Sequence, residues 1–422
     1  MEAYIVISVL IFMIVMFVIG KWPYGLITMT CCAILAVTGV LDVSTAFMGF
    51  ANRNLILLAG AFIVSNAFGK TGIIATLKHR ILHMQNGKTG MILMAIFIGA
   101  IILLSSFLPS PAVLAIIIVI SHNLSDDADL CPSRIILPAA ALSTLWVSRI
   151  PFGMGAVYFT RINAFIEPYG EQYSIGMFEP FKVAIVPLLV CSLYTILCYK
   201  LLPRQKVERP KETTAQALGS SMSRKDEIIT YIVFAAMMLC MLLNKITGNL
   251  MYVVPAACAL ILCFTKTITV EEAKKTLSGD LIFMLAGIYV LSDALSSTGA
   301  GEMIGNVILS LMGDVSSPFM LCVVFIGATL IVTNLMSNMA TFNMVIPLAV
   351  STALAAGIEP GPLATAVAIA STCALVLPCS SGESAMAYAA SGYNMGRTFK
   401  FTIPFVLLFY ISILASMMIF YY

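Results

Sequence analysis

Charged residues are scarce in this chain, and their scarcity excludes most water-soluble folds. Only 10% of the 422 residues are Asp, Glu, Lys or Arg, whereas 60% are hydrophobic and the mean hydropathy is +1.01. A soluble protein of this size needs a more polar surface, so lipid is the expected solvent for most of the chain. The net charge of +3 is also too small to indicate a nucleic acid or another polyanion as a partner.

The sequence also lacks the patterns that mark enzymes and metal sites. It contains only three histidines, no HExxH, no GxSxG at a strand-to-helix turn and no Gly-rich phosphate loop, which disfavours a membrane enzyme. The eleven cysteines are scattered through mostly apolar segments without a CxxC pair, which favours buried thiols over disulfides or a metal site. We therefore expect no enzymatic activity and no organic cofactor.

Long apolar runs are abundant instead. Stretches of roughly 15 to 20 residues recur from end to end, about the length that a helix needs to cross a bilayer, and helices are expected rather than barrel strands. The first run lacks a basic leader and a cleavage site, so we expect it to be retained as a helix. Ten crossings are predicted, at residues 3–19, 24–40, 55–69, 139–160, 183–199, 228–244, 250–265, 281–296, 362–391 and 401–420.

The two halves of the chain are related in sequence at an offset of 227 residues. The aligned positions are 59–67 with 286–294, Gly72 with Gly299, and Ser110 with Ser337. An internal duplication is the simplest explanation. It predicts a first repeat at 1–202 and a second repeat at 228–422, joined by a polar linker at 203–227.

Each half holds one further apolar region, at 90–121 and at 318–356, that is interrupted near its middle. We interpret both as re-entrant hairpins, because five crossings per half then leave the second repeat inverted relative to the first. The segments 73–84 and 302–312, which precede the hairpins, have a mixed polarity that suits helices lying along the membrane faces.

The distribution of positive charge supports this topology. It places eighteen Lys and Arg residues on the linker's side of the membrane and only Arg53, Arg161, Lys182 and Lys245 on the other side. The positive-inside rule then makes the linker cytoplasmic. We expect a multi-pass protein of the cell membrane with both termini outside.

Polar side chains gather where the second hairpin turns, at 333–341. A hairpin tip offers unpaired carbonyl groups to a cation and helix N-termini to an anion, although Ser and Asn also form hydrogen bonds between helices without any ligand. This tip resembles that of the divalent anion/sodium symporter family of the ion transporter superfamily. The family has Ser-Asn-Thr, then Ala-Thr and a proline, and here Ser337-Asn338-Met339-Ala340-Thr341 with Pro347 departs from it only at Met339. The first copy, at 110–114, keeps only the serine.

The resemblance also implies a broken helix beside each hairpin, 139–160 and 362–391. Proline and glycine interrupt these spans and place Arg149 in the first break and Glu383 in the second. Charged groups at membrane depth are costly, so a functional role is expected. Arg149 would bind an anionic group of the substrate, and Glu383 would hold the coupling cation or carry a proton. The alternative is an ion pair between the two with no ligand.

The fold class is therefore an all-α integral membrane protein with two inverted repeats of five transmembrane helices, each with one re-entrant hairpin and one broken helix. The resemblance implies a homodimeric symporter of a di- or tricarboxylate or sulfate coupled to sodium. Proton-coupled transport or exchange of a monocarboxylate, zwitterion or inorganic anion is an alternative. A passive anion channel is an alternative of a different functional class, although paired hairpins suit a transporter with alternating access better than a channel.

The predicted site residues fall into three groups. Substrate is expected at Ser110, Arg149, Ser337, Asn338 and Thr341. A coupling cation, with sodium as the first candidate, is expected at Asn334, Ser337, Asn338, Ser380, Ser381, Gly382 and Glu383. A first-repeat site comprises Ser106, Ser110, Ser148 and Gly153.

Overall fold

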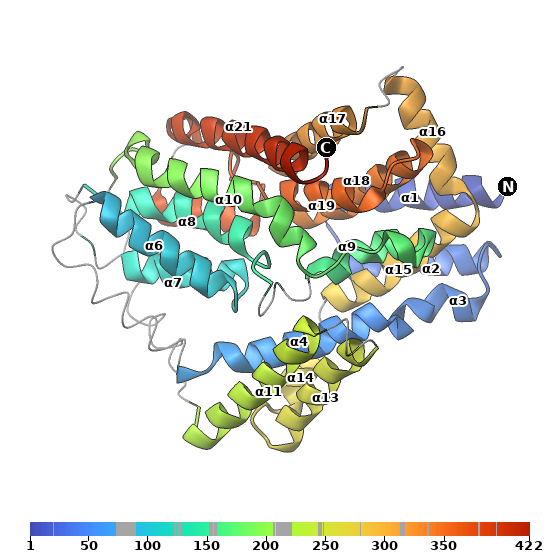
Figure 1. The fold of residues 1–422 in the computed structure, drawn as a ribbon, viewed down its shortest axis with the longest axis horizontal. Coiled ribbons are helices and arrows are strands. Elements are labelled where there is room, and N and C mark those ends of the chain that lie inside the picture. Colours follow the sequence, from blue (N-terminus) through green and yellow to red (C-terminus); the bar gives the residue numbers. More distant parts are fainter. Residues whose placement is uncertain are drawn as a thin grey trace.

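Helices make up almost all the regular structure of this computed structural model (Figure 1). The structure describes residues 1–19, 21–72, 90–121, 124, 129–151, 155, 158–205, 207, 222–243, 247, 249–278, 280–312, 317–335, 337–378, 380–393 and 395–422, and no strand occurs within these ranges. The all-helical expectation is confirmed.

The first half contains nine described α-helices and four short 3-10 turns. Their bounds are α1 (Glu2–Ile19), α2 (Tyr24–Val37), α3 (Val43–Phe47), η1 (Met48–Ala51), α4 (Arg53–Gly69), α6 (Gly90–Ser105), α7 (Ser110–Ser121), α8 (Pro132–Trp146), α9 (Tyr158–Ile166), η3 (Glu167–Tyr169), η4 (Glu171–Tyr173), α10 (Glu179–Cys198) and η5 (Tyr199–Leu201).

The second half has a similar order. Its described helices are α11 (Arg224–Leu242), α13 (Leu250–Phe264), α14 (Val270–Leu277), α15 (Asp280–Ser297), α16 (Ala300–Met312), α17 (Pro318–Leu335), α18 (Asn338–Ala355), α19 (Pro360–Ala370), α20 (Gly382–Ser391) and α21 (Met395–Phe420). The predicted surface segment at 302–312 is helical, as α16, whereas 73–84 lies outside the described residues.

The interrupted regions of the sequence correspond to pairs of helices. The region 90–121 holds α6 and α7, and 318–356 holds α17 and α18. The broken helices are α8 with α9 and α19 with α20. The first of them was predicted too short, because α8 begins at Pro132, where a proline is tolerated in the first turn. Arg134 does not end the helix, since its Nε donates to the carbonyl oxygen of Leu202 at 2.9 Å.

The helices start and pack in a pattern that is consistent with the predicted duplication. The first residues of α4 and α15 are 227 positions apart, as are those of α3 and α14. α4 packs on α13 and α15 packs on α2, which are equivalent contacts between the halves. A Cβ on Gly60 would overlap the backbone of Pro255, and one on Gly287 would overlap Thr28. Glycine at these two equivalent positions therefore permits the same close crossing twice.

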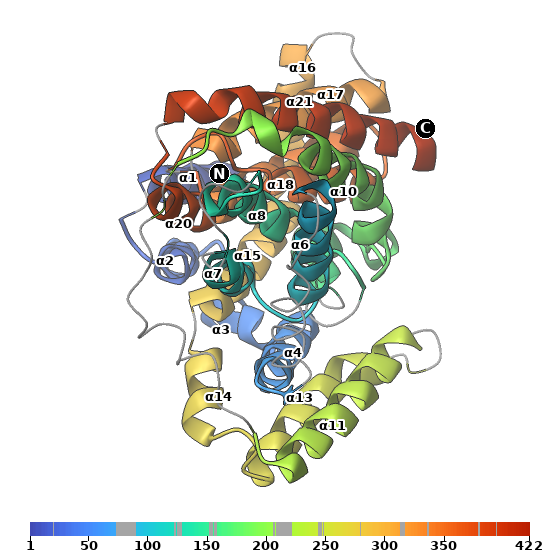
Figure 2. The same ribbon diagram turned by 90° about the vertical axis from the view of Figure 1, so that its left-hand side faces the viewer.

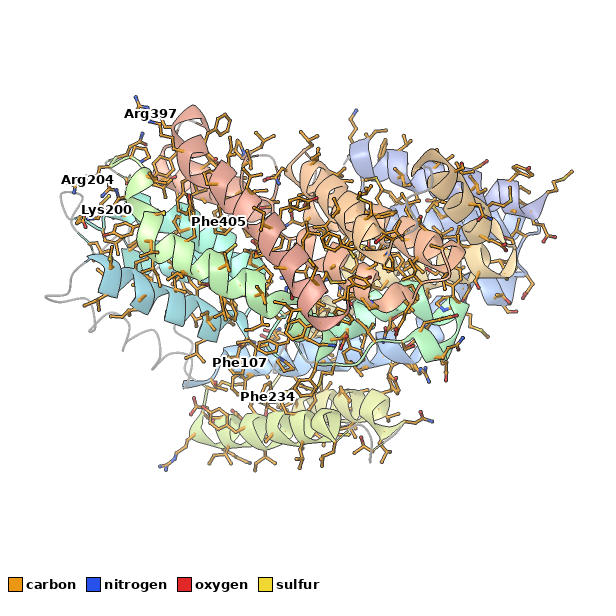
Figure 3. All side chains as sticks on the ribbon, turned by 45° about the horizontal axis from the view of Figure 1, so that its top comes forward. Phe107, Lys200, Arg204, Phe234, Arg397 and Phe405 are labelled. Atoms are coloured by element: carbon orange, nitrogen blue, oxygen red, sulfur yellow. The ribbon has the colours of Figure 1, made fainter. Side chains whose placement is uncertain are left out.

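The helices form two unequal groups (Figures 1 and 2). α11, α13 and α14 lie beneath α4, whereas the hairpin and broken helices lie in the larger group with α10 and α21. Aromatic rings join the groups near the first hairpin tip: Phe68 stacks on Phe234 at 4.2 Å between ring centroids and meets Phe107 at 4.7 Å. Figure 3 shows Phe107 above Phe234 at this junction.

The described ion pairs join residues that were predicted to lie on the same side of the membrane. Asp129 pairs with Arg134, Lys200 and Arg204, all expected on the linker's side, and Figure 3 shows Lys200 and Arg204 at the same end of the molecule as Arg397. The Tyr199 hydroxyl and Lys200 hold the pKa of the Asp129 carboxyl below its ordinary value.

On the side expected to face outward, Arg53 pairs with Glu171 at 2.9 Å. Arg161 departs from the predicted distribution. It was expected with Arg53 on the outer side, but it lies in α9 and lines a cavity between the helices.

Helix length tests the crossings only in part. Four described helices are long and apolar enough to cross a membrane, or five if 43–51 and 55–69 form one bent span. Two of the four are α17 and α18, whereas α6 and α7 have 16 and 12 residues. Several predicted crossings, such as α2 with 14 residues, are also short. The ten crossings, the re-entrant hairpins and the inversion therefore stay predictions.

Candidate functional site

A cavity of about 280 Å³ lies where the hairpin tips meet the two broken helices. The first residues of α7, α9, α18 and α20 line it, together with residues that follow α8 and α19. Eight predicted site residues lie in this lining: Ser110, Ser148, Arg149, Ser337, Asn338, Ser381, Gly382 and Glu383. Residues from both repeats therefore come together in one place.

Four other predicted residues lie outside the lining, and Gly153 lies outside the described residues. Ser106 donates to the carbonyl oxygen of Ile102, Thr341 to that of Ser337 and Ser380 to that of Leu377. In each of these bonds the hydroxyl proton is donated to a carbonyl three or four residues earlier in the chain, not to another part of the site. The fourth residue, Asn334, has a different role.

Asn334 holds the break between α19 and α20. Its Nδ2 donates to the carbonyl oxygens of Leu330 at 2.8 Å and Cys373 at 3.1 Å, and its Oδ1 accepts from the amides of Leu375 at 3.1 Å and Val376 at 2.9 Å. These bonds use both donors and both acceptor sites of the amide. Asn334 thus satisfies backbone groups that an unwound helix leaves unpaired, rather than facing the cavity.

Arg149 is the most deeply buried charge in the lining, at 1% exposure. Its Nη2 donates to Thr372 Oγ1 at 2.9 Å, and its Cζ lies 4.4 Å from the centre of the Tyr158 ring. Within the described part of the chain, its Nε and Nη1 have no hydrogen-bond partner. A buried guanidinium with unmade hydrogen bonds is costly, so the site is suited to an added anion.

Local backbone geometry sets the position of Arg149. Ser148 has φ of 58°, a conformation that L side chains rarely adopt, and the chain leaves α8 at this point. A Cβ on Gly155 would overlap the carbonyl oxygen of Ile150, so glycine lets the chain fold back tightly before α9. Strain of this kind concentrates at functional sites.

Arg161 is a second guanidinium in the lining that the sequence analysis missed. Its Nη2 lies 3.1 Å from Met339 Sδ, and its Cζ lies 4.8 Å from the centre of the Phe342 ring. The Nε is buried without a partner among the described residues. The argument that identified Arg149, that a charged side chain inside the membrane is costly, would also have identified Arg161, because it is the only charged residue in α9.

Glu383 supplies the negative charge of the lining. It lies in the first turn of α20, is half-buried and accepts a hydrogen bond from the hydroxyl of Ser110. Over the described ranges, no ion pair joins Glu383 to Arg149. The ligand-free ion pair considered from the sequence is therefore absent from this conformation.

Helix N-termini add to the positive character of the cavity. Ser337 caps α18 by accepting from the amide of Ala340 at 3.2 Å, and Ser381 caps α20 by accepting from the amide of Ser384 at 3.0 Å. α7 begins at Ser110 in the same lining. The N-terminal end of a helix carries a partial positive charge that favours anions. Three helix ends and two guanidinium groups thus face one carboxylate.

The known proteins that resemble this chain are transporters. The sequence model of a family described as "Citrate transporter" matches residues 14–370. The "Putative malate transporter YflS" of Bacillus subtilis is 25% identical over 343 residues, which cover 73% of this chain and 67% of that one. The "Sodium-dependent dicarboxylate transporter SdcS" of Staphylococcus aureus is 26% identical over 119 residues, 28% of this chain and 22% of that one.

The fold is also similar to that of a solved transporter. The crystal structure of the YdaH transporter of Alcanivorax borkumensis superposes with a TM-score of 0.62 and covers 96% of both chains, at 13% sequence identity. At that identity the likeness concerns the fold alone.

Proposed function

This chain belongs to the citrate transporter family of the ion transporter superfamily, and from that premise we propose that it carries a small di- or tricarboxylate, or sulfate, across the cell membrane. As a member of that family it is a multi-pass secondary transporter rather than an enzyme. The names of the malate and dicarboxylate relatives support a carboxylate as the substrate. The expected homodimer stays a prediction.

The observation that carries the proposal is the pair of buried guanidinium groups in one cavity. Arg149 is held by Thr372 and Tyr158 and keeps its Nε and Nη1 hydrogens for a ligand. Carboxylate and sulfate oxygens make strong charge-assisted hydrogen bonds with guanidinium. The N-termini of α7, α18 and α20 add further donors, so a compact anion with two or more charges fits this lining best.

Glu383 is the proposed site of the coupling cation. The sodium-dependent relative supports sodium at this carboxylate. A proton is the second candidate, because no ion pair neutralises Glu383 among the described residues. An ionised Glu383 beside the bound anion is repelled by it, and either cation relieves that repulsion.

Uptake by reconstituted protein tests both roles. Replacing Arg149→Gln is expected to lower the uptake of citrate, malate or sulfate at least tenfold, since a direct contact to the anion is lost. Replacing Glu383→Gln is expected to abolish the response to an imposed sodium or proton gradient while anion binding persists.

Arg397→Gln is a suitable control, because this arginine is exposed and lies outside the cavity. Normal, gradient-driven uptake by both cavity variants would contradict the proposal. Passive flux that never concentrates the anion would identify a channel instead.

A further inference from the structure

The guanidinium of Arg161, a residue of α9, lies against the tip of the second hairpin. Its guanidinium contacts Met339, the second residue of α18, through Sδ, and lies over the ring of Phe342 one turn later. The bonding partners are thus a sulfur atom and an aromatic face rather than a carboxylate. A fixed positive charge lies where an unwound hairpin would otherwise present oxygen atoms to a mobile cation.

The remaining chemistry of this tip is poorly suited to a free metal cation. Hard cations such as sodium prefer oxygen ligands, and a thioether is a soft one. The side-chain oxygen of Asn338 accepts from the hydroxyl of Thr333 at 3.1 Å, and that of Ser337 accepts from the amide of Ala340 at 3.2 Å. All four hydrogen-bonding positions of Asn334 hold the neighbouring break. Oxygen atoms at this tip are therefore largely committed to the protein itself.

Electrostatics point in the same direction. Arg149 and Arg161 both face the ring of Tyr158, with their Cζ atoms 4.4 and 5.7 Å from its centre. A mobile cation entering between them would meet two like charges in a setting where charges are weakly screened. Among the described residues of the lining, the only carboxylate is that of Glu383, which belongs to α20 and contacts the first hairpin through Ser110.

We propose that Arg161 is a built-in cation of the second hairpin: its guanidinium balances the charge of the bound anion where a separate sodium ion would otherwise be needed. This inference rests on the proposed function, in which the anion binds in the same cavity. Glu383 is then the one position where a cation binds and leaves during transport. The positive charge that Arg161 places at the second hairpin then adds nothing to the coupling ratio.

Ligand-induced thermal shifts of the purified full-length protein test the proposal. In Glu383→Gln protein, where the other cation position is removed, sodium chloride is expected to give no stabilisation beyond that of choline chloride. Arg161→Gln is expected to weaken citrate or malate binding about tenfold or more, and Arg161→Lys to restore much of it, because the charge is retained. The double variant Arg161→Ala with Met339→Thr supplies space and an oxygen, so its anion binding is expected to require sodium.

The outcomes separate the inference from the proposed function. If no citrate, malate or sulfate stabilises the wild-type protein, the proposed function fails. If an anion does, yet Arg161→Gln binds it as tightly as the wild type, or sodium specifically stabilises Glu383→Gln protein, the built-in cation is refuted and the transport assignment stands. Unliganded melting temperature and gel-filtration profile check that each variant is folded, and Arg397→Gln, exposed and outside the cavity, controls for the loss of a positive charge.

Discussion

Tyr158 shows how one side chain can organise a cavity with two like charges. Its ring faces Arg149 and Arg161, and its hydroxyl donates to the carbonyl oxygen of Ala368 at 3.2 Å. The negative face of an aromatic ring attracts a cation without cancelling its charge. Tyr158 therefore stabilises both guanidinium groups while leaving their hydrogens available, which a carboxylate partner would not do.

Substitutions that separate the ring from the hydroxyl test this role. Tyr158→Phe keeps the ring, so anion affinity is expected to stay within about threefold of the wild type, with about 1 kcal/mol of stability lost with the hydrogen bond. Tyr158→Leu removes the ring and is expected to weaken affinity about tenfold, because each cation–π contact is worth about 1 kcal/mol. Calorimetric titration with citrate or malate measures both, and equal affinities in the two variants would show that the ring does not position the arginines.

At the scale of helices, the broken helices depend on side chains from neighbouring elements. The break after α19 is held by Asn334 of α17 and by two residues of α20: Ser384 donates to the carbonyl oxygen of Ala374 at 2.7 Å and Tyr388 to that of Val376 at 3.1 Å. Proline and glycine predicted where the helix would break. Only the packing shows how its freed backbone groups are satisfied.

Removing the amide that holds this break should destabilise the protein as a whole. Asn334→Ala removes the partner of three backbone groups in the break, the carbonyl of Cys373 and the amides of Leu375 and Val376, and a loss of about 2–4 kcal/mol in the free energy of unfolding is expected. The measurement is the melting temperature in detergent. Asn66→Ala is the matched control, since the side chain of Asn66 on α4 is exposed. Similar small shifts in the two variants would mean that the break is held by other contacts.

At the scale of the whole molecule, helices of each half pack on helices of the other. α2 packs on α15 and α13 packs on α4, so neither repeat forms its packing alone. The cavity follows the same rule, because Arg149 of the first repeat is held by Thr372 of the second. A site shared between two related halves is suited to alternating access, in which one half moves relative to the other.

The inverted arrangement predicts which loops face each side of the membrane. Cysteines introduced at Glu271 and Arg397 are expected to react only with a cytoplasmic reagent, and those at Gln172 and Glu359 only with an impermeant reagent added outside. All four positions are exposed, whereas the described native cysteines are buried or half-buried, which keeps background labelling low. Labelling of the Gln172 and Arg397 positions, which are nearly equivalent in the two repeats, from the same side would reject the inversion.

Much of this protein was predictable from sequence because hydropathy, helix breakers and repeats are local properties of the chain. The apolar runs predicted the helices, the offset of 227 predicted matching elements, and the cost of buried charge singled out Arg149 and Glu383, both of which line the cavity. The boundary of the first broken helix was less accurate. Pro132 and Arg134 suggest a helix end in isolation, but a tertiary contact accommodates the arginine.

The sequence by itself determined that this chain is helical and lipid-embedded, and that its two hairpin tips and two breaks are polar. Only the tertiary structure decided that Arg161 joins the cavity and that Asn334 serves the backbone. The physical reason is that these roles depend on contacts such as Arg161 with Met339, 178 positions apart, and Arg149 with Thr372, 223 positions apart. Such distant pairs leave no trace in local composition, because packing of the whole chain brings them together.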